Sequence, residues 1–476
     1  MISRLRAGLI SSLGVALIAV SAVGGGEIRS VRFSSEGDLS PSLLGEGSLL
    51  GQGVVLSDSL LEQEIIRIDS LCFSRGRLAA EIAVDTLITE EGVEVLVTVE
   101  EGEWTLVGKV AVTGSTAIPH NEIEGLLDLK EGDRFLPGDL GAALARLLEY
   151  YNRSGFPFAQ VWLTGFEYDG RRNRVDLAIS IFEGETSIIS DVSFEGLGGT
   201  DSLFARRLSR LRPGSRYDER SVDRGRAYLE SSGIFDRVGE PVVKQTGKGS
   251  VEVVYPVEEI ERSNLFQGGF GISQKEGDDY VLSGAVDLML ENIAGRGRDA
   301  HLSWINNGES YSRLELSYIE PFLFSSPIGV ETRIRQIVQD SIYVYHSAGL
   351  FFGYRVGPGL AVEAGASVDR NVPEQEELVR SIRQRYRLGV AKTAGSRFNI
   401  EFHVEGAYKR SYLEGDRRER DEQLLYRLAA DLRVPLFYGT GIFWRFVSEA
   451  VFSSNEIHAA ETYPIGGAAS LRGYRE

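Results

Sequence analysis

The sequence predicts two kinds of structure in succession: α+β repeats of the order βααββ, then an all-β antiparallel transmembrane β-barrel. In the first half of the chain, landmark residues recur at a fixed offset of 82 residues. In the second half, the helical period gives way to strands in which apolar and polar residues alternate. The length of 476 residues also requires several domains, because a single core stops growing at about 250 to 300 residues.

The first residues have the pattern of an export signal. Arg4 and Arg6 precede an uncharged apolar run over residues 7–23, and Ala19, Ser21 and Ala22 are small enough for cleavage. We therefore expect residues 1–22 to be a signal peptide. An uncleaved membrane anchor is the alternative, although the run is short for a spanning helix. No later run reaches about 18 apolar residues, so a mature protein in the membrane would have to be a barrel.

The repeats are defined by three landmarks that share the offset. The first landmark is Val110-x-Val112-x-Gly114, which recurs as Val192-x-Phe194-x-Gly196. The second is Glu101-Gly102-Glu103, which recurs as Glu183-Gly184-Glu185, and the third is Gly132, which recurs as Gly214. Val31 and Phe33 begin a weaker first copy, in which Ser35 takes the place of the glycine. The pattern predicts three repeats, at residues 27–102 (degenerate), 103–184 and 185–260.

Within the second repeat, the helical and strand periods are both visible. One helix face carries Leu140, Leu144, Leu147, Leu148 and Tyr151, and we expect Asp139 to cap its start and Gly155 its end. Val175, Leu177, Ile179 and Ile181 then alternate with polar or small residues, as in a sheet with one face against helices. The third repeat follows the same order, with Asp218 before its second helix.

After Glu261 the chain reads as a barrel wall, and residues 263–476 are predicted to be one domain. Strands of about ten residues alternate, as in Phe398, Ile400, Phe402 and Val404 against Asn399, Glu401, His403 and Glu405. A soluble sandwich also alternates and stays an alternative. About eleven strands precede residue 454, and an open edge in lipid would leave backbone groups unsatisfied. We therefore expect the barrel to be incomplete here, with closing strands after Glu476.

The first predicted barrel strand, Leu265 to Ser273, is rich in glycine. Its residues Phe266, Gly268, Gly269, Phe270 and Gly271 combine aromatic side chains with three glycines, each of which weakens a strand by about 0.5 to 1 kcal/mol relative to alanine. We predict that this strand is a weak seam that opens laterally. The alternative is that the glycines only permit the coiling needed for closure.

The end of the sequence holds an arginine between turn-permitting residues. The motif consists of Gly466, Gly467, Leu471, Arg472, Gly473 and Tyr474. After a row of alternating strands, it resembles the Arg-Gly-Phe/Tyr loop of the outer-membrane assembly factors, the BamA and TamA superfamily. The βααββ repeats, with Tyr151, Gly155 and Phe156, resemble the POTRA domains of that family. Two further stretches, 292–297 and 318–324, resemble their counterparts in its barrels.

The resemblance implies a function and a location. The chain is expected to be an outer-membrane protein assembly factor whose periplasmic POTRA repeats receive unfolded β-barrel precursors by strand addition, while the barrel templates their insertion. Expected partners are those client proteins, outer-membrane lipid, and periplasmic or lipoprotein accessory subunits. In the family, the loop arginine meets acidic residues in the barrel lumen. Three repeats rather than five are more like TamA than BamA, and the sequence leaves the branch and the clients open.

Other function classes find little support. The net charge of -18 repels phosphate backbones, so nucleic acid is not an expected partner. Cys72 is the single cysteine, and the five histidines show no metal-ligand spacing, so we predict no metal, cofactor or catalytic residue. His403, between Glu401 and Glu405, is the nearest approach to a site. The remaining alternatives are a two-partner-secretion or autotransporter-type translocation barrel and, in another class, a passive outer-membrane channel.

Overall fold

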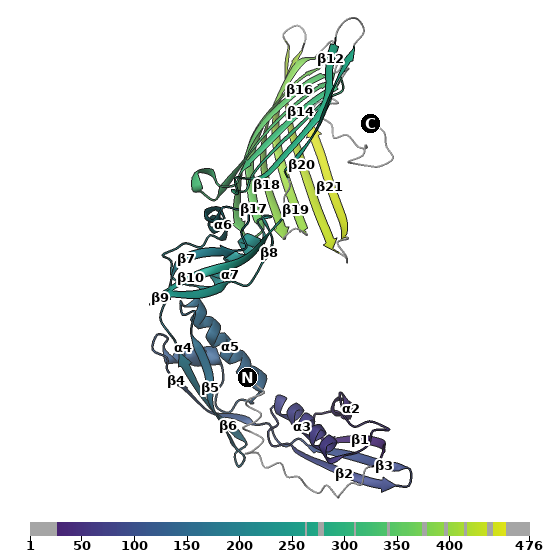
Figure 1. The fold of residues 1–476 in the computed structure, drawn as a ribbon, viewed down its shortest axis with the longest axis vertical. Helices are drawn as coiled ribbons and strands as arrows, with labels where there is room; N and C mark the ends of the chain where they lie inside the picture. Colours follow the sequence, from purple (N-terminus) through teal and green to yellow (C-terminus); the bar gives the residue numbers. More distant parts are fainter. Residues whose placement is uncertain are drawn as a thin grey trace. The chain divides into compact units, whose positions relative to one another are not determined.

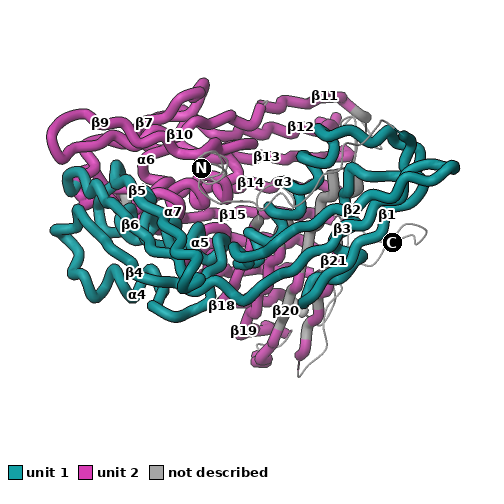
Figure 2. The backbone as a smooth tube through the Cα atoms, turned by 90° about the horizontal axis from the view of Figure 1, so that it is seen from below, with its two compact units in different colours: residues 1–186 teal, residues 187–476 magenta. Residues whose placement is uncertain are grey.

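A computed structural model describes residues 26–261, 264–274, 280–308, 311–339, 343–373, 378–394, 398–413, 417–435 and 441–453. The chain divides into two compact units, residues 1–186 and 187–476, which Figure 2 distinguishes by colour. Unit 1 holds two α+β repeats, and unit 2 holds a third repeat followed by a large antiparallel sheet. The third repeat is therefore grouped with the barrel strands rather than with the other two repeats.

The first repeat has the predicted βααββ order in spite of its degenerate sequence. Its elements are β1 (Ile28–Glu36), α2 (Pro41–Gly45), α3 (Asp58–Ser74), β2 (Glu81–Thr89) and β3 (Gly92–Glu100) (Figure 1). β3 lies between a parallel β1 and an antiparallel β2. Ser40 and Ser57 cap the two helices. Alternate residues of β3 are at most 2% exposed and form the centre of the core: Val93, Val95, Val97 and Val99.

The second repeat has the same order of elements, and its second helix can be compared with the predicted one. It consists of β4 (Leu106–Thr113), α4 (His120–Leu127), α5 (Pro137–Arg153), β5 (Gln160–Asp169) and β6 (Arg174–Phe182), with sheet order β4-β6-β5. Leu140, Leu147 and Tyr151 of α5 are buried against the sheet, as predicted. The prediction for the cap was wrong: α5 begins at Pro137, whose fixed φ suits a first turn, so Asp139 lies inside that turn. Gly155 follows the helix end with a φ of +90°.

The third repeat departs from the plan at one edge. It contains β7 (Ile188–Glu195), α6 (Ser202–Ser209), α7 (Glu219–Glu230), β8 (Phe235–Val238), β9 (Val242–Gly247) and β10 (Ser250–Glu259). β10 pairs with β7 and with both β8 and β9, so the predicted outer strand is split in two. Pro241 lies in the break and has no backbone N–H to donate. Asp218 caps α7, as predicted.

A hydrogen-bonded carboxylate, buried in the first two repeats and half-buried in the third, stabilises each repeat just after, or at the end of, its central strand. Glu101 accepts from the Leu39 amide (2.5 Å) and the Ser35 hydroxyl (2.9 Å). Glu183 accepts from the amides of Thr116 and Ala117, at 3.0 and 2.9 Å, and from the Tyr151 hydroxyl at 2.9 Å. Glu259 accepts from the amides of three successive residues, at 2.9 to 3.0 Å: Gly198, Gly199 and Thr200. Each carboxylate thus fixes the loop that follows the first strand of its repeat.

These hydrogen bonds shift the acidity of the carboxylates. Burial by itself raises the pKa of Glu183, but the hydrogen bonds from Thr116, Ala117 and Tyr151 outweigh it and lower the pKa from 4.5 to about 2. The same balance between burial and hydrogen bonding lowers the pKa of Glu101 and of Glu259. All three side chains are therefore charged at neutral pH, and the charge stabilises the loops.

The second half of unit 2 is one antiparallel sheet of 11 strands in sequence order. Its strands are β11 (Leu265–Gln274), β12 (Tyr280–Ile293), β13 (Arg298–Asn306), β14 (Tyr311–Glu320), β15 (Ile328–Gln339), β16 (Tyr343–Gly357), β17 (Leu360–Pro373), β18 (Leu378–Ala394), β19 (Phe398–Leu413), β20 (Arg418–Pro435) and β21 (Gly441–Ser453) (Figure 1). This confirms the predicted number of strands. Among the described residues, the sheet is not closed between β11 and β21.

Burial on the two faces of this sheet is inverted relative to a soluble protein. On one face, apolar side chains such as Leu350, Tyr386 and Leu388 are 42 to 69% exposed. On the other, the charged groups of Asp369 and Lys409 are at most 3% exposed. A soluble sandwich would bury its apolar face and expose its charges. The sheet is therefore a barrel wall with an apolar face for lipid and a polar interior.

Within the described part of the chain, no helix has both the length and the apolar character that crossing a membrane requires.

We predict that residues 27–186 unfold as one cooperative soluble unit and that Glu183→Gln destabilises it. The substitution should lower the free energy of unfolding by about 2 kcal/mol at pH 7, because a neutral amide replaces a charged acceptor of several buried hydrogen bonds. Urea denaturation followed by circular dichroism measures the difference. Because the folded pKa is depressed, the contribution is complete above pH 4.5 and is lost as the pH falls towards 2.

The exposed Glu167 supplies the control, since Glu167→Gln on β5 should change stability by less than about 0.5 kcal/mol. Equal stability of the wild type and Glu183→Gln at pH 7 would contradict the assigned role of the carboxylate.

Candidate functional site

The first barrel strand, β11, forms an edge of the large sheet. It pairs with β12 alone, residue for residue from Leu265 opposite Met289 to Gln274 opposite Tyr280, and no other described strand lies beside it. Its outward side chains Phe266, Phe270 and Ile272 are 65 to 75% exposed. β11 therefore presents a row of backbone donors and acceptors together with apolar side chains.

The glycines of β11 are not equivalent. A side chain at Gly268 would lie 3.3 Å from the Ala285 carbonyl, and one at Gly271 would lie 3.2 Å from the Ser283 hydroxyl. A side chain at Gly269 would meet no atom within 4 Å. Packing against β12 therefore restricts two of the positions, whereas at Gly269 the strand simply lacks the side chain that would strengthen its pairing.

The opposite end of the sheet is β21, which pairs with β20 alone among the described strands. Its side chains Trp444, Phe446 and Phe452 are 43 to 58% exposed, and the rings of Trp444 and Phe446 stack at 6.1 Å. Both ends of the described sheet thus combine an unpaired backbone edge with exposed aromatic residues.

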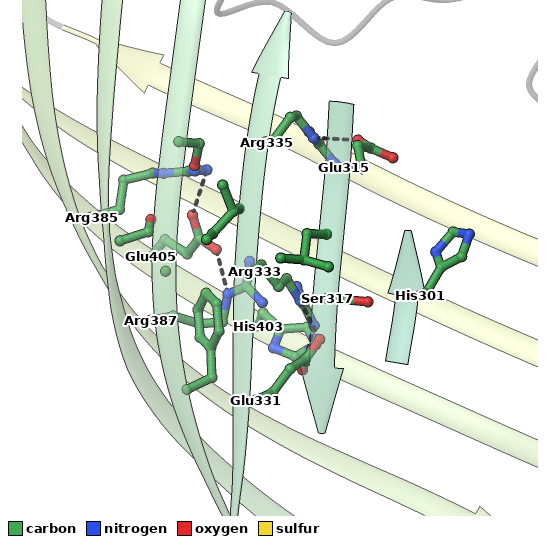
Figure 3. Close-up of a pocket in the computed structure, with 16 residues that line it drawn as sticks. His301, Glu315, Ser317, Glu331, Arg333, Arg335, Arg385, Arg387, His403 and Glu405 are labelled. Atoms are coloured by element: carbon green, nitrogen blue, oxygen red, sulfur yellow. Dashed lines mark hydrogen bonds and ion pairs between the residues drawn. The ribbon is translucent and has the colours of Figure 1, made fainter. Parts of the chain in front are cut away.

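The polar face carries a network of ion pairs around a cavity of about 470 Å³, drawn in Figure 3. Glu405 accepts from Arg387 at 2.5 Å and from Arg385 at 3.5 Å. Asp369 accepts from Arg385 and from the Ser347 hydroxyl, both at 2.8 Å. In a second group, Glu315 pairs with Arg335 at 2.5 Å and with Arg313 at 2.7 Å. The first group joins the neighbouring strands β16 to β19 along the polar face, and the second joins β14 to β15.

An aromatic ring lies inside this network. Phe351 is 4% exposed, and a side chain at either Gly349 or Gly365 would overlap its ring, so the ring lies flat against these two glycines. The guanidinium groups of Arg333 and Arg387 stack over it, at 4.9 and 4.5 Å from its centroid. The two glycines thus allow an apolar ring to organise charges in the polar interior.

The chemistry of the interior is electrostatic. His403, singled out by the sequence, lies in the same network, with its ring nitrogens 3.8 Å from Glu363 and 3.6 Å from Glu401. Among the described residues, no group of three or more His, Cys, Asp or Glu side chains has a geometry that could hold a metal ion. The network suits a structural interior that excludes lipid and holds the strands in register.

The third repeat is fixed to the first turn of the barrel. In the turn after β12, the Gly295 carbonyl accepts a hydrogen bond from the backbone N–H of Asp201 (2.8 Å). The side-chain amide of Asn292 donates to the Thr200 hydroxyl (3.1 Å). Gly295 and Gly297 have φ values of +69° and +64°. A side chain at Gly295 would overlap the Gly199 carbonyl, so the two backbones are in close contact.

Aromatic and cationic groups extend this contact. The Phe204 ring lies where a side chain at Gly297 would be, and it packs edge-on against Phe322 at 5.7 Å. Arg210 donates to the Arg355 carbonyl (2.6 Å) and stacks over Tyr228 at 4.3 Å. The loop that receives the barrel turn is the same loop that Glu259 holds. We call this contact the repeat–barrel junction.

The outer strands of the three repeats differ in continuity. β2 pairs with β3 over all nine residues without a register shift. β5 has an irregularity at Leu163 and Gly165, and the corresponding strand of the third repeat is broken into β8 and β9. The opposite edge of the first repeat is partly covered, because Ile28 exchanges backbone hydrogen bonds with Gly53 and Val54. β2 is therefore the longest unbroken edge among the repeats.

The structure locates one of the two predicted site motifs. Phe266, Gly268, Gly269, Phe270 and Gly271 lie on the free edge strand β11. The loop from Gly466 to Tyr474, with Arg472, lies outside the described residues, and its role stays a prediction.

Sequence reasoning missed the interior arginines and the repeat–barrel junction. Arg383, Arg385 and Arg387 alternate along β18, which is a readable signal for a charged face. Phe204 and Arg210 carried no such signal, because their partners lie up to 145 residues further along the chain.

Comparison with known proteins identifies two of the repeats and shows what the chain is similar to. A family model described as POTRA, "Surface antigen variable number repeat", matches residues 105–184 and 187–260. The outer membrane protein assembly factor BamA of Neisseria meningitidis serogroup B is 23% identical over 235 residues, covering 49% of this chain and 29% of its own. BamA of Nitratidesulfovibrio vulgaris is 23% identical over 291 residues, covering 60% of this chain and 35% of its own. Two of the repeats therefore match the POTRA family, and the chain as a whole is similar to Omp85-type proteins such as BamA.

Solved structures of similar arrangement include a BamA from Haemophilus ducreyi lacking POTRA domains 1-3, with a TM-score of 0.48 and 18% identity over 78% of this chain and 75% of that one. CdiB from Acinetobacter baumannii has a TM-score of 0.43 and 12% identity over 87% and 80% of the two chains. The chain spans about a third of the length of the two curated BamA relatives. The POTRA repeats and the similarity to the BamA relatives support a location in the outer membrane, with the repeats in the periplasm.

We predict that Gly297→Val loosens the repeat–barrel junction. A β-branched residue at positive φ costs about 1 to 3 kcal/mol, and its side chain would overlap the Phe204 ring. Residue-resolved hydrogen exchange should show faster exchange of the Asp201 amide, which donates to the turn. The amides of Gly198 and Gly199 should stay protected, because Glu259 still holds them.

Gly214→Val is the matched control, since Gly214 has a φ of +88° but no atom within 4 Å of an added side chain. It introduces the same backbone strain away from the junction. Unchanged protection of Asp201 in Gly297→Val would show that this contact does not hold the third repeat.

Proposed function

We propose that this protein is an Omp85-type outer-membrane protein assembly factor. Its POTRA repeats receive unfolded β-barrel precursors by strand addition, and its barrel templates their insertion into the membrane. The observation that carries the proposal is β11, a glycine-rich strand that pairs with β12 alone among the described residues and carries exposed aromatic side chains. Such an edge supplies backbone hydrogen bonds to an incoming strand whatever its sequence.

The repeats support the first step of this function. A strand added to β2 or β5 would find unpaired backbone groups in water, where binding is reversible and insensitive to most side chains. Accessory subunits in the periplasm are part of the proposal, because exposed apolar side chains such as Trp162 and Phe182 of the second repeat offer contact surface.

The weak seam explains how β11 would be released. Each glycine lowers strand stability by about 0.5 to 1 kcal/mol, so separation of the first strand from a closing strand requires less free energy than in a strand without glycines. A translocation barrel of the same fold would instead pass its substrate through the lumen, and a passive channel would need no seam. If the protein were a translocation barrel or a passive channel, a substitution that stabilises the pairing of β11 should therefore leave transport unchanged.

We predict that Gly269→Val in the full-length protein lowers client insertion by about two- to fivefold. Valine favours the extended strand by about 0.5 to 1 kcal/mol over glycine, which reduces the open population by that factor. Gly269 is chosen because a side chain there meets no atom within 4 Å. Insertion is measured with an unfolded barrel precursor and reconstituted vesicles, and barrel stability by heat-modifiability on gels.

Gly353→Val is the matched control: Gly353 lies in the middle of the sheet on β16, also with open space around an added side chain. It should leave insertion unchanged. Unchanged insertion in a stably folded Gly269→Val protein would rule out the seam and favour a lumenal route. The predicted role of Arg472 in this function rests on the resemblance of its loop.

A further inference from the structure

The negative net charge of the protein is concentrated in unit 1. Residues 27–186 contain 28 Asp and Glu against 13 Lys and Arg, which is most of the net charge of -18. The imbalance is strongest along the hairpin of the first repeat: between Arg77 and Lys109 the sequence has eight carboxylates and no Lys or Arg. This hairpin consists of β2 and β3, so the most acidic stretch of the chain includes the longest unbroken free edge among the repeats.

The carboxylates nearest the free edge are not neutralised. Arg29 and Arg32 of β1 pair with Glu91 of the β2–β3 turn and Glu94 of β3, at 2.8 and 3.3 Å. In the part of the chain that the structure describes, no ion pair involves Glu81, Asp85 or Glu90, and all three are exposed. Glu81 even faces another carboxylate, Glu100, across the strand pair. Like charges in this position favour a cationic partner.

Apolar side chains lie in the same row. Leu87 is 62% exposed and follows Asp85 by two residues, so Glu81, Asp85 and Leu87 share one face of β2. Leu96 of β3, opposite Asp85, is 39% exposed, and Ile88 on the other face is 64% exposed. A strand that pairs with β2 would therefore meet two carboxylates four residues apart and, two residues further, an apolar patch.

We propose that the β2 edge of the first repeat selects cationic extended segments of client polypeptides. The preferred segment carries Lys or Arg at two positions four residues apart, so that one cation lies opposite Glu81 and the other opposite Asp85. Two positions after the cation opposite Asp85, it carries an apolar residue. The inference rests on the proposed receiving function of the repeats and assigns that function its specificity. Backbone hydrogen bonds hold the segment, while the charges choose among segments and speed their capture.

The test uses the full-length protein in lipid nanodiscs and two labelled peptides. One is Thr-Lys-Val-Thr-Val-Lys-Val-Ile-Val-Thr, and the other has Glu in place of both Lys. Fluorescence anisotropy at low salt should show binding of the Lys peptide about 10-fold tighter than that of the Glu peptide, since two attractions are replaced by two repulsions. At an ionic strength of about 1 M, where screening acts over about 3 Å, the preference should largely disappear.

Two double variants locate the effect. Glu81→Lys with Asp85→Lys should reverse the preference between the peptides. Glu62→Lys with Glu103→Lys changes the net charge equally at exposed positions away from the edge and should leave the preference intact. Reversal by the control pair as well would overturn the edge as the selecting surface.

The outcomes separate this inference from the function on which it rests. Equal binding of both peptides at low salt would overturn charge selection while leaving strand capture in place. Failure of both peptides to bind would overturn the receiving step itself.

Discussion

Unpaired backbone groups at the edges of β-sheets are the constraint on which this structure depends. A strand edge in water is open to pairing with other chains, and an edge in lipid leaves each unsatisfied N–H or C=O at a cost of several kcal/mol. The chain covers some edges and leaves others free. The start of β1 is covered by residues 53–56, and the third repeat breaks its outer strand at Pro241. β2 and β11 stay free within the described residues, and they are the edges to which we assign capture and insertion.

The rest of the architecture holds these edges in defined places. Each repeat fixes the loop after its first strand with a hydrogen-bonded carboxylate, and in the third repeat that loop also contacts the first barrel turn through Gly295 and Gly297. In the barrel, ion pairs around Glu405 and Asp369 join neighbouring strands across the polar face. A rigid wall beside a glycine-rich first strand places flexibility where the proposed insertion step requires it, because the glycines weaken the pairing of β11.

Much of the fold was predictable because its signals are local. The spacing of apolar residues in α5 and β6, and the alternation of apolar and polar residues after Glu261, indicate which face of each element is buried. The offset between repeats indicates that the same order of elements recurs. The choice between a soluble sandwich and a barrel wall was not local, since alternation is the same in both, and only the exposure of Leu388 beside the burial of Asp369 settles it. The wrong cap at Asp139 reflects Pro137, which starts the helix two residues earlier. Contacts such as Arg210 with Arg355 join residues far apart in sequence, which no periodicity encodes.

The central claim is that an incoming client strand pairs with β11, and cysteine crosslinking tests it directly. Cys72 is the only native cysteine and is buried, so single cysteines placed at Gln267, Gly269 and Gly271 report on this strand alone. Each is combined with single cysteines along the terminal strand of a radiolabelled barrel precursor during insertion. The account predicts disulfides in one register with a period of two residues, and none with a cysteine at Gly353. Disulfides that form equally at Gly353, or insertion that proceeds with no disulfide at any β11 position, would contradict it.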